Sequence, residues 1–337
     1  MEKQARYEWI DTLRFLGMLA IYVGHLGNQQ SGRLYSFVWY YHVPMMFFVS
    51  GLFAKRTQNV SAKEFLKKKF GTIMIPYYVF GVFAFAIYLL FASVSVPDIL
   101  KSGVRLLFGV KDVYWAQALW FLPALFLMAV LYYSLNKLLK NKWLVLGCCI
   151  ILAFVFKYGI REAIPYEQFY PFSITYAFRY IDYYAIGDVL GSVILLREYR
   201  HKKILAVGLL IPTIYAILLF DDCDLLMIKE FNTINRIWPG QYFMELLRVF
   251  LLTGSQILLS LMISGWKLVR EVGEKSLYVC GNEFLVKTAF TETLCMLNLP
   301  AAPGDEMQAL LYCFIAMIIV VKCLVPGQKA LIERIKP

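Results

Sequence analysis

Apolar runs about as long as a bilayer is wide recur from one end of this chain of 337 residues to the other. A transmembrane helix needs about 20 such residues. The runs are too many for a single anchor and too evenly spread for a soluble domain with a tail, and they lie at 9–26, 35–54, 72–93, 117–135, 143–157, 181–196, 204–220, 243–264, 276–297 and 307–325. We therefore expect an all-α, polytopic bundle of about ten transmembrane helices, forming a single integral-membrane domain over residues 1–337.

Composition supports a membrane protein. Hydrophobic residues make up 60% of the chain, charged residues make up 17%, and the mean hydropathy is +0.61, whereas soluble domains are about half apolar and about a quarter charged. The 7 cysteines lie mostly inside the apolar runs without paired spacing, so we expect neither a disulfide framework nor a metal site. Asp11 and Arg14 interrupt the first run, which argues against a cleaved signal peptide.

The distribution of basic residues predicts the orientation. With a cytoplasmic N-terminus, the segments on the inside carry more than twice as many Lys and Arg residues as those on the outside. An even number of helices then places both termini in the cytoplasm, and we expect a multi-pass protein of the bacterial inner membrane. The net charge of +11 indicates topology and contact with membrane lipid rather than nucleic acid. Nothing in the sequence sets the oligomeric state.

Ionisable residues inside a membrane span are costly and are functional candidates by default. The first run, YEWIDTLRFLGMLAIYVGHLG, places Asp11 and Arg14 three residues apart and His25 eleven residues after Arg14. At 3.6 residues per turn Arg14 and His25 share a face, about 16 Å apart along the axis. A long donor such as coenzyme A could extend between a guanidinium and an imidazole acting as general base. The alternatives are an Asp11–Arg14 salt bridge and an interfacial histidine.

The second run, FVWYYHVPMMFFVSGLFAKR, contains His42, a proline expected to break the helix, and the small pair Ser50 and Gly51. Proline and small residues let chains and ligands approach closely, although a simple packing kink explains them too. Lys67, Lys68 and Lys69 follow. These lysines suit donor phosphates or lipid headgroups at the cytoplasmic mouth.

Later runs also contain charges. Asp188 follows Gly187, and the pairs Glu245 with Arg248 and Glu283 with Lys287 have helical spacing, so neutralisation within a helix explains both pairs without a function. The predicted outer loops, 157–180 and 221–242, are rich in aromatic, acidic and amide residues. Such surfaces suit saccharides, and an interfacial aromatic belt is the alternative.

At these residues the chain resembles acyltransferase family 3, in particular its fucose 4-O-acetylase-like branch. The resemblance rests on Arg14 and His25 in YEWIDTLRFLGMLAIYVGHLG and on YHVPMMFFVSGLF, with weaker matches in KKKFGTIMIPYY, ALWFLPALF and GEKSLY. It implies ten helices, a cytoplasmic acetyl-CoA donor, an acceptor sugar outside or on a lipid carrier, His25 as the catalytic histidine and Arg14 as a donor contact.

Two departures from the family pattern affect the site. Glu283 stands where many relatives have a histidine, so a second histidine role does not transfer, and the glutamate is a candidate base or acceptor ligand. The basic residue commonly found as arginine before Pro76 is replaced by Lys67 to Lys69 at a longer distance.

We therefore expect an O-acetyltransferase that moves an acetyl group from acetyl-CoA to a hydroxyl of a cell-surface saccharide, directly or through an acyl-histidine. The candidate residues are catalytic His25, Asp11, Arg14 and His42, donor-binding Arg14, Lys68 and Lys69, and substrate-binding Ser50, Trp120 and Glu283. The alternatives are a polysaccharide or lipid-linked sugar exporter, another acyl donor and an amino acceptor. An exporter needs no general base and would more often show repeated halves.

Overall fold

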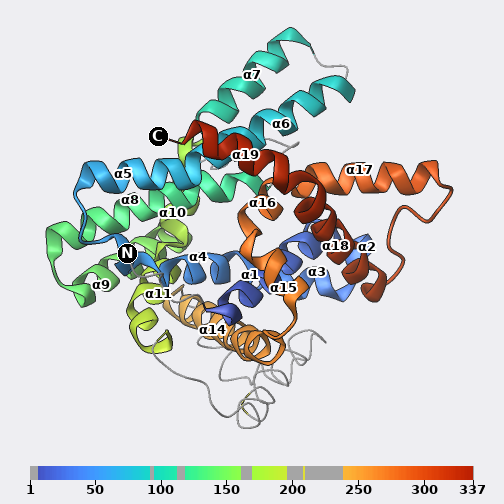
Figure 1. The fold of residues 1–337 in the computed structure, drawn as a ribbon. Coiled ribbons are helices and arrows are strands. Elements are labelled where there is room, and N and C mark those ends of the chain that lie inside the picture. The colour runs from blue at the N-terminus through green and yellow to red at the C-terminus, as the bar shows by residue number, and fades with distance from the viewer. Residues whose placement is uncertain are drawn as a thin grey trace. The chain divides into compact units, whose positions relative to one another are not determined.

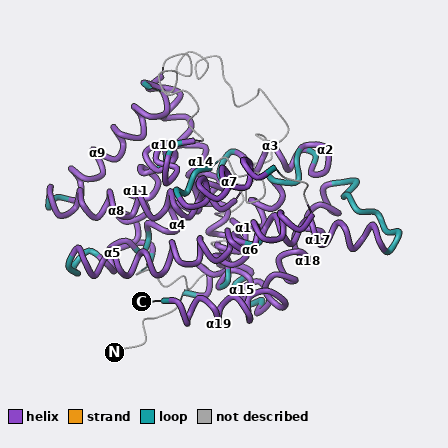
Figure 2. The backbone as a smooth tube through the Cα atoms, turned by 90° about the horizontal axis from the view of Figure 1, so that it is seen from above, coloured by secondary structure: helices purple, strands orange, loops and turns teal. Residues whose placement is uncertain are grey.

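The structure is a computed structural model that describes residues 7–91, 95–111, 118–160, 169–195, 208 and 238–336. Its regular secondary structure in these ranges is entirely helical, as Figures 1 and 2 show. The predicted all-α class is confirmed. Helices satisfy their own backbone hydrogen bonds, which is what a hydrocarbon environment requires of a spanning segment.

Six helical segments among the described residues are long and apolar enough to cross a membrane. They are Arg33–Arg56, Ala62–Leu89, Ala118–Leu139, Lys142–Gly159, Pro239–Ile263 and Glu306–Ile335. Two further expected spans, the first and the sixth, are helices of 17 and 14 residues. The run at 204–220 lies outside the described residues apart from position 208, so the count of ten stays a prediction.

The chain divides into two compact units. The first unit comprises Met1–Met46, Arg197–Ser276 and Leu294–Ile318, and the second comprises Phe47–Leu196, Leu277–Thr293 and Ile319–Pro337. The expectation of a single domain over the whole chain stays a prediction.

The first unit is built around its N-terminal helix. Its helices are α1 (Glu8–Gly24), α2 (Asn28–Ser31), α3 (Arg33–Trp39), the start of α4 (His42–Gly51), α14 (Trp238–Ile263), α15 (Lys267–Glu274) and most of α18 (Glu306–Ile319). Helix α1 packs on α3, α14 and α15 and is buried along most of its length. Leu13 and Tyr22 have no exposed surface. Because α1 is so enclosed, polar side chains on it are in fixed surroundings.

Helix α15 approaches α1 at a glycine. A Cβ added at Gly273 would overlap the carbonyl oxygen of Asp11. We expect Gly273→Ala to lower the free energy of unfolding by about 3 kcal/mol or more, because backbone atoms cannot move aside as a flexible side chain can.

The matched control for this substitution is Gly254→Ala in α14, where an added Cβ meets no atom of the described residues within 4 Å. That change should be neutral or slightly stabilising, because alanine favours a helix over glycine. The measurement is the free energy of unfolding of both variants in detergent. Equal values for the two variants would contradict the close approach of α15 to α1.

The second unit contains most of the remaining helices. They are the end of α4, η1 (Ala54–Thr57), α5 (Ala62–Lys69), η2 (Phe70–Met74), α6 (Ile75–Phe91), α7 (Val96–Leu107), α8 (Phe121–Leu139), α9 (Lys142–Phe154), η4 (Val155–Gly159), η6 (Pro171–Ser173), α10 (Ile174–Arg179), α11 (Ile181–Ile194), nearly all of α16 (Ser276–Gly281), most of α17 (Glu283–Met296), η8 (Val320–Leu324) and α19 (Val325–Ile335). Helix α11 packs on α8 and α9.

Small residues set the spacing between α4 and α11. A Cβ at Gly51 would overlap the backbone of Tyr184, a Cβ at Gly187 of α11 would overlap the backbone of α4 at Phe48, and a Cβ at Gly191 would overlap the backbone of Leu52, just after α4. Glycines four residues apart let membrane helices approach closely. The expected role of Gly51 in close packing is therefore confirmed.

Prolines are accommodated differently from the sequence expectation. Pro44 does not break a helix, because it occupies the first turn of α4, where its missing N–H needs no partner. The interruption lies at Tyr40 and Tyr41, between α3 and α4. A proline has no backbone N–H to donate to the preceding turn of a helix. Upstream of Pro76 and Pro326, the π-helical segments η2 and η8 accommodate this missing hydrogen bond within otherwise continuous helices.

Two other expectations are corrected. The run at 276–297 is not one helix, because α16 ends at Gly281 and α17 begins at Glu283. Asn282 between them exchanges two amide hydrogen bonds of 2.8 Å with Gln328. Segment 157–180 is not a loop throughout, since Lys157 is buried in η4 and Tyr176 is buried in α10. Apolar packing and the buried charge pair of Lys157 hold η4 and α10 in the bundle.

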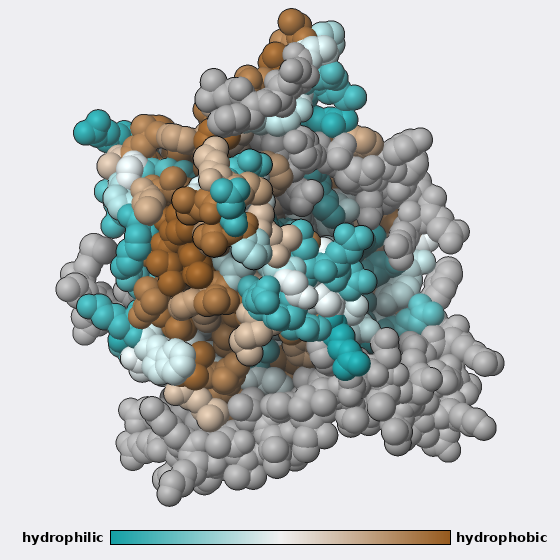
Figure 3. All heavy atoms as spheres, turned by 90° about the vertical axis from the view of Figure 1, so that its right-hand side faces the viewer, coloured by the Kyte–Doolittle hydropathy of each residue, from teal (hydrophilic) through white to brown (hydrophobic). Residues whose placement is uncertain are grey.

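Large apolar side chains are exposed on both units. Met296 and Met307 of the first unit are 81% and 73% exposed, and Leu138 and Ile151 of the second are 77% and 63% exposed. Figure 3 shows hydrophobic residues gathered on part of the face turned toward the viewer. A hydrophobic surface of this kind is stable in contact with lipid.

Candidate functional site

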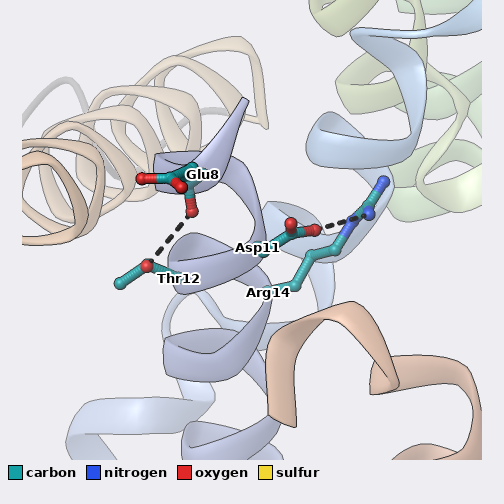
Figure 4. Close-up of polar contacts among 4 residues, drawn as sticks. All are labelled: Glu8, Asp11, Thr12 and Arg14. Carbon is teal, nitrogen blue, oxygen red and sulfur yellow. Dashed lines mark hydrogen bonds and ion pairs between the residues drawn. The ribbon is translucent and has the colours of Figure 1, made fainter. Parts of the chain in front are cut away.

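The N-terminal end of α1 carries an ion pair. Arg14 Nη1 lies 3.4 Å from Asp11 Oδ1, as the spacing of three residues predicts, and Figure 4 shows the two side chains together on one side of the helix. The Asp11 side chain is 7% exposed and that of Arg14 is 31% exposed. Asp11 therefore fixes the guanidinium where part of it still reaches solvent.

A second arginine that sequence reasoning missed lies at the same end of α1. Arg270 of α15 forms an ion pair with Glu8, and its Nε is buried with no hydrogen-bond partner in the part of the chain that the structure describes. The charge on Arg270 was visible in the sequence, but nothing there related residue 270 to residue 8. Two guanidinium groups thus lie at the N-terminal end of α1.

His25 lies at the other end of α1. Its backbone N–H bonds to Ile21 O at 3.0 Å, so the helical phase continues to this residue. The side chain is half-buried. The geometry of a regular helix puts His25 about 16 Å from Arg14 on the same face, as expected from the sequence.

His25 belongs to a row of rings with Trp39 and His42, and all three residues are in the first unit. The ring centroids of His25 and Trp39 are 6.3 Å apart, and those of Trp39 and His42 are 4.9 Å apart. Gly24 makes this possible, because a Cβ there would lie 3.2 Å from Val38 and 3.6 Å from the Trp39 indole nitrogen. Sequence reasoning selected both histidines but missed Trp39.

The tautomer of His42 follows from its partner. Its Nδ1 lies 2.7 Å from the carbonyl oxygen of Val38, which can only accept. Nδ1 therefore donates the proton, and Nε2 is the basic nitrogen of the neutral ring. The side chain is 1% exposed. His42 is a rigid imidazole with a defined acceptor nitrogen.

The predicted donor lysines lie on α5 in the second unit. Lys68 is exposed, while Lys69 is half-buried and its Nζ lies 5.7 Å from the ring of Phe65. The segment that follows is π-helical, and Pro76 lies near the start of α6. A role for Lys68 or Lys69 in phosphate binding stays a prediction.

The predicted substrate-binding residues are also in the second unit. Ser50 is half-buried in α4, and Trp120 lies 4.8 Å from the Tyr176 ring, with Lys111 Nζ 4.9 Å above Trp120. Glu283 is 2% exposed and pairs with Lys287 at 2.8 Å. The expected neutralisation within the helix is present, and a role for Glu283 in binding or catalysis stays a prediction.

One buried and one partly buried polar cluster of the second unit were not predicted. Lys157 Nζ lies 3.3 Å from Asp182 Oδ2, and these side chains are 3% and 0% exposed. Asp188 Oδ2 accepts hydrogen bonds from Tyr132 at 2.8 Å and from Gln58 at 3.2 Å, while its Oδ1 is buried and finds no hydrogen-bond partner among the described residues. In the first unit, Arg248 lies 4.7 Å above the ring of Tyr40, and neutralisation of Glu245 by Arg248 within α14 stays a prediction.

The fold and this helix define the class: a multi-pass helical membrane protein with an arginine and a histidine on one face of its first helix. A family model described as an acyltransferase domain matches residues 7–325, so the chain belongs to acyltransferase family 3 and is a membrane acyltransferase. Neither a curated protein nor a solved structure matches it. The fucose 4-O-acetylase-like branch stays a prediction.

Proposed function

We propose that this acyltransferase moves an acetyl group from cytoplasmic acetyl-CoA to a hydroxyl of a cell-surface saccharide, or of its lipid-linked precursor, in a bacterial inner membrane. The observation that supports this proposal is the first helix, where Arg14 is held by Asp11 and His25 follows about 16 Å further along the same face. A donor with phosphates at one end and a thioester at the other suits that separation.

The proposed chemistry is acyl transfer with His25 as general base. The imidazole takes the proton of the acceptor hydroxyl, the oxygen attacks the thioester carbonyl, the C–S bond breaks, and the thiol leaves with a proton. A transient acyl-histidine is the alternative route. Trp39 would position His25, because its ring packs beside that of His25, and His42, whose tautomer is fixed, packs against the ring of Trp39.

Family membership favours an enzyme over the exporter. The acceptor is argued from chemistry alone: Trp120 is half-buried beside Tyr176, and an aromatic ring of this kind is one on which sugars stack. An amino acceptor and a longer acyl donor remain alternatives for the same catalytic residues.

We expect Arg14→Gln to raise the KM for acetyl-CoA by about 10- to 100-fold with a smaller change in kcat. The reason is that one charge-assisted contact to a phosphate is lost far from the reacting carbonyl. Initial rates over a range of acetyl-CoA concentrations would show this. An unchanged KM would assign Arg14 to structure alone, through its pair with Asp11.

The matched control is Lys275→Gln, which also removes a cation paired with an acid of its own helix. Lys275 pairs with Glu271 at 2.9 Å and, like Arg14, is partly exposed. Its loss should leave the KM for acetyl-CoA unchanged, and an equal rise in both variants would indicate a general effect of net charge.

A further inference from the structure

Helix α7 is amphipathic and too short to cross a bilayer. It has 12 residues, and it lies outside the six candidate spans. Val96, Leu100, Val104 and Leu107 form one stripe along it, with exposed fractions between 54% and 69%. A helix with an open apolar face and charges beside it is stable along the membrane interface.

The opposite side of α7 is fixed to the second unit. Leu106 is buried against Gly81 of α6, and the Tyr77 and Tyr78 hydroxyls donate to the carbonyl oxygens of Leu106 and Leu107 at 2.7 and 3.1 Å. Figure 1 shows α6 and α7 side by side. The exposed stripe is thus held in place and not left on a loose segment.

A cleft of about 460 Å³ opens beside this stripe. Its lining residues are Leu100, Lys101, Val104, Arg105, Phe108, Val110, Phe169 and Pro171. Leu100 and Val104 belong to the stripe as well, so the apolar surface continues from α7 into the cleft. The volume lies within the range of ligand pockets, about 300–1,000 Å³.

The described lining of the cleft includes two cations, Lys101 and Arg105. Lys101 and Arg105 are one helical turn apart, so their side chains project from the same side of α7. The Arg105 guanidinium lies 4.8 Å above the ring of Phe169, which holds it at the wall. Apolar walls with two adjacent cations complement an anion attached to a hydrocarbon chain.

We propose that this cleft binds an anionic phospholipid, with the phosphate between Lys101 and Arg105 and an acyl chain along Leu100 and Val104. Lysine gives the phosphate a mobile point charge and arginine gives it a planar, oriented donor pair. The site is independent of the proposed acetyl transfer, and its occupant would anchor α7 at the interface.

The test uses the full-length protein in detergent and counts bound lipid by native mass spectrometry. The probe is phosphatidylglycerol, and phosphatidylcholine is the uncharged comparison. We expect the wild type to prefer phosphatidylglycerol and the Lys101→Gln/Arg105→Gln variant to bind it at least about 10-fold more weakly.

The matched control is Lys137→Gln/Lys142→Gln. These exposed cations of the same unit also lie over rings, 5.4 Å above Tyr133 and 4.9 Å above Trp143, but line no part of the cleft. The control variant should bind phosphatidylglycerol as the wild type does. Equal weakening in both double variants, or no preference for phosphatidylglycerol, would overturn the proposal.

A third variant tests the acyl chain. Val104→Asn keeps both cations but removes part of the apolar wall, and it should weaken binding of phosphatidylglycerol. Soluble glycerol phosphate should not displace the lipid. Unchanged binding by Val104→Asn, or displacement by glycerol phosphate, would indicate a site for free anions and would overturn the lipid assignment.

Discussion

Replacing His25 by alanine should lower the rate of acetyl transfer by about 10²- to 10⁴-fold, the usual contribution of a general base. The affinity for acetyl-CoA should change little, because the predicted phosphate contact is Arg14 at the other end of α1. His25 is half-buried and ends the helix, so its truncation removes little packing. A large loss of kcat in a folded protein is therefore the expected result.

The measurement compares initial rates in membranes that contain equal amounts of wild type and variant. His25→Asn is the second variant, because it retains hydrogen-bonding groups but cannot accept a proton at neutral pH. It should be as impaired as His25→Ala. Near-normal rates in either variant would remove His25 from the mechanism and leave the buried imidazole of His42 as the candidate base.

The second large effect concerns stability. Asp182→Leu should cost about 3–5 kcal/mol of unfolding free energy, because it leaves the Lys157 ammonium buried without its carboxylate. The Lys157 side chain is 3% exposed, and its nitrogen lies 4.6 Å from the ring of Tyr183, which offers only partial compensation.

Two further variants separate the charge pair from general packing. Lys157→Met/Asp182→Leu replaces both charges by apolar groups and should recover most of the lost stability. Glu333→Ala breaks the exposed pair with Lys329, where both side chains are 60% exposed, and should have no measurable effect. If the double variant were as unstable as Asp182→Leu alone, the lost free energy of unfolding would come from changed side-chain packing and not from an unpaired charge.

Features that depend on local helix geometry were predictable from the sequence. The Asp11–Arg14 and Glu283–Lys287 contacts follow from spacings of three and four residues. The shared face of Arg14 and His25 follows from the helical repeat. Apolar runs likewise identified most helices, because a bilayer imposes both their length and their composition.

Contacts between distant segments were not predictable in this way. Lys157 and Asp182 are 25 residues apart, and hydropathy placed Lys157 outside the membrane because it could not show the partner that neutralises it. Trp39 resembled any interfacial aromatic residue until the structure placed it between His25 and His42. Pro44 correctly indicated that a helix is interrupted nearby. The interruption precedes the proline, however, because a proline in the first turn marks where a helix begins.

The most direct test of the proposed reaction uses sealed membrane vesicles with the cytoplasmic face outward, supplied with acetyl-labelled CoA. We predict that label enters surface glycan or its lipid-linked precursor only when the protein is present, and that mild alkali releases it as acetate, as expected of an O-ester. Absence of label with acceptor present would contradict acetyl-CoA as donor, and alkali-stable label would contradict a hydroxyl acceptor.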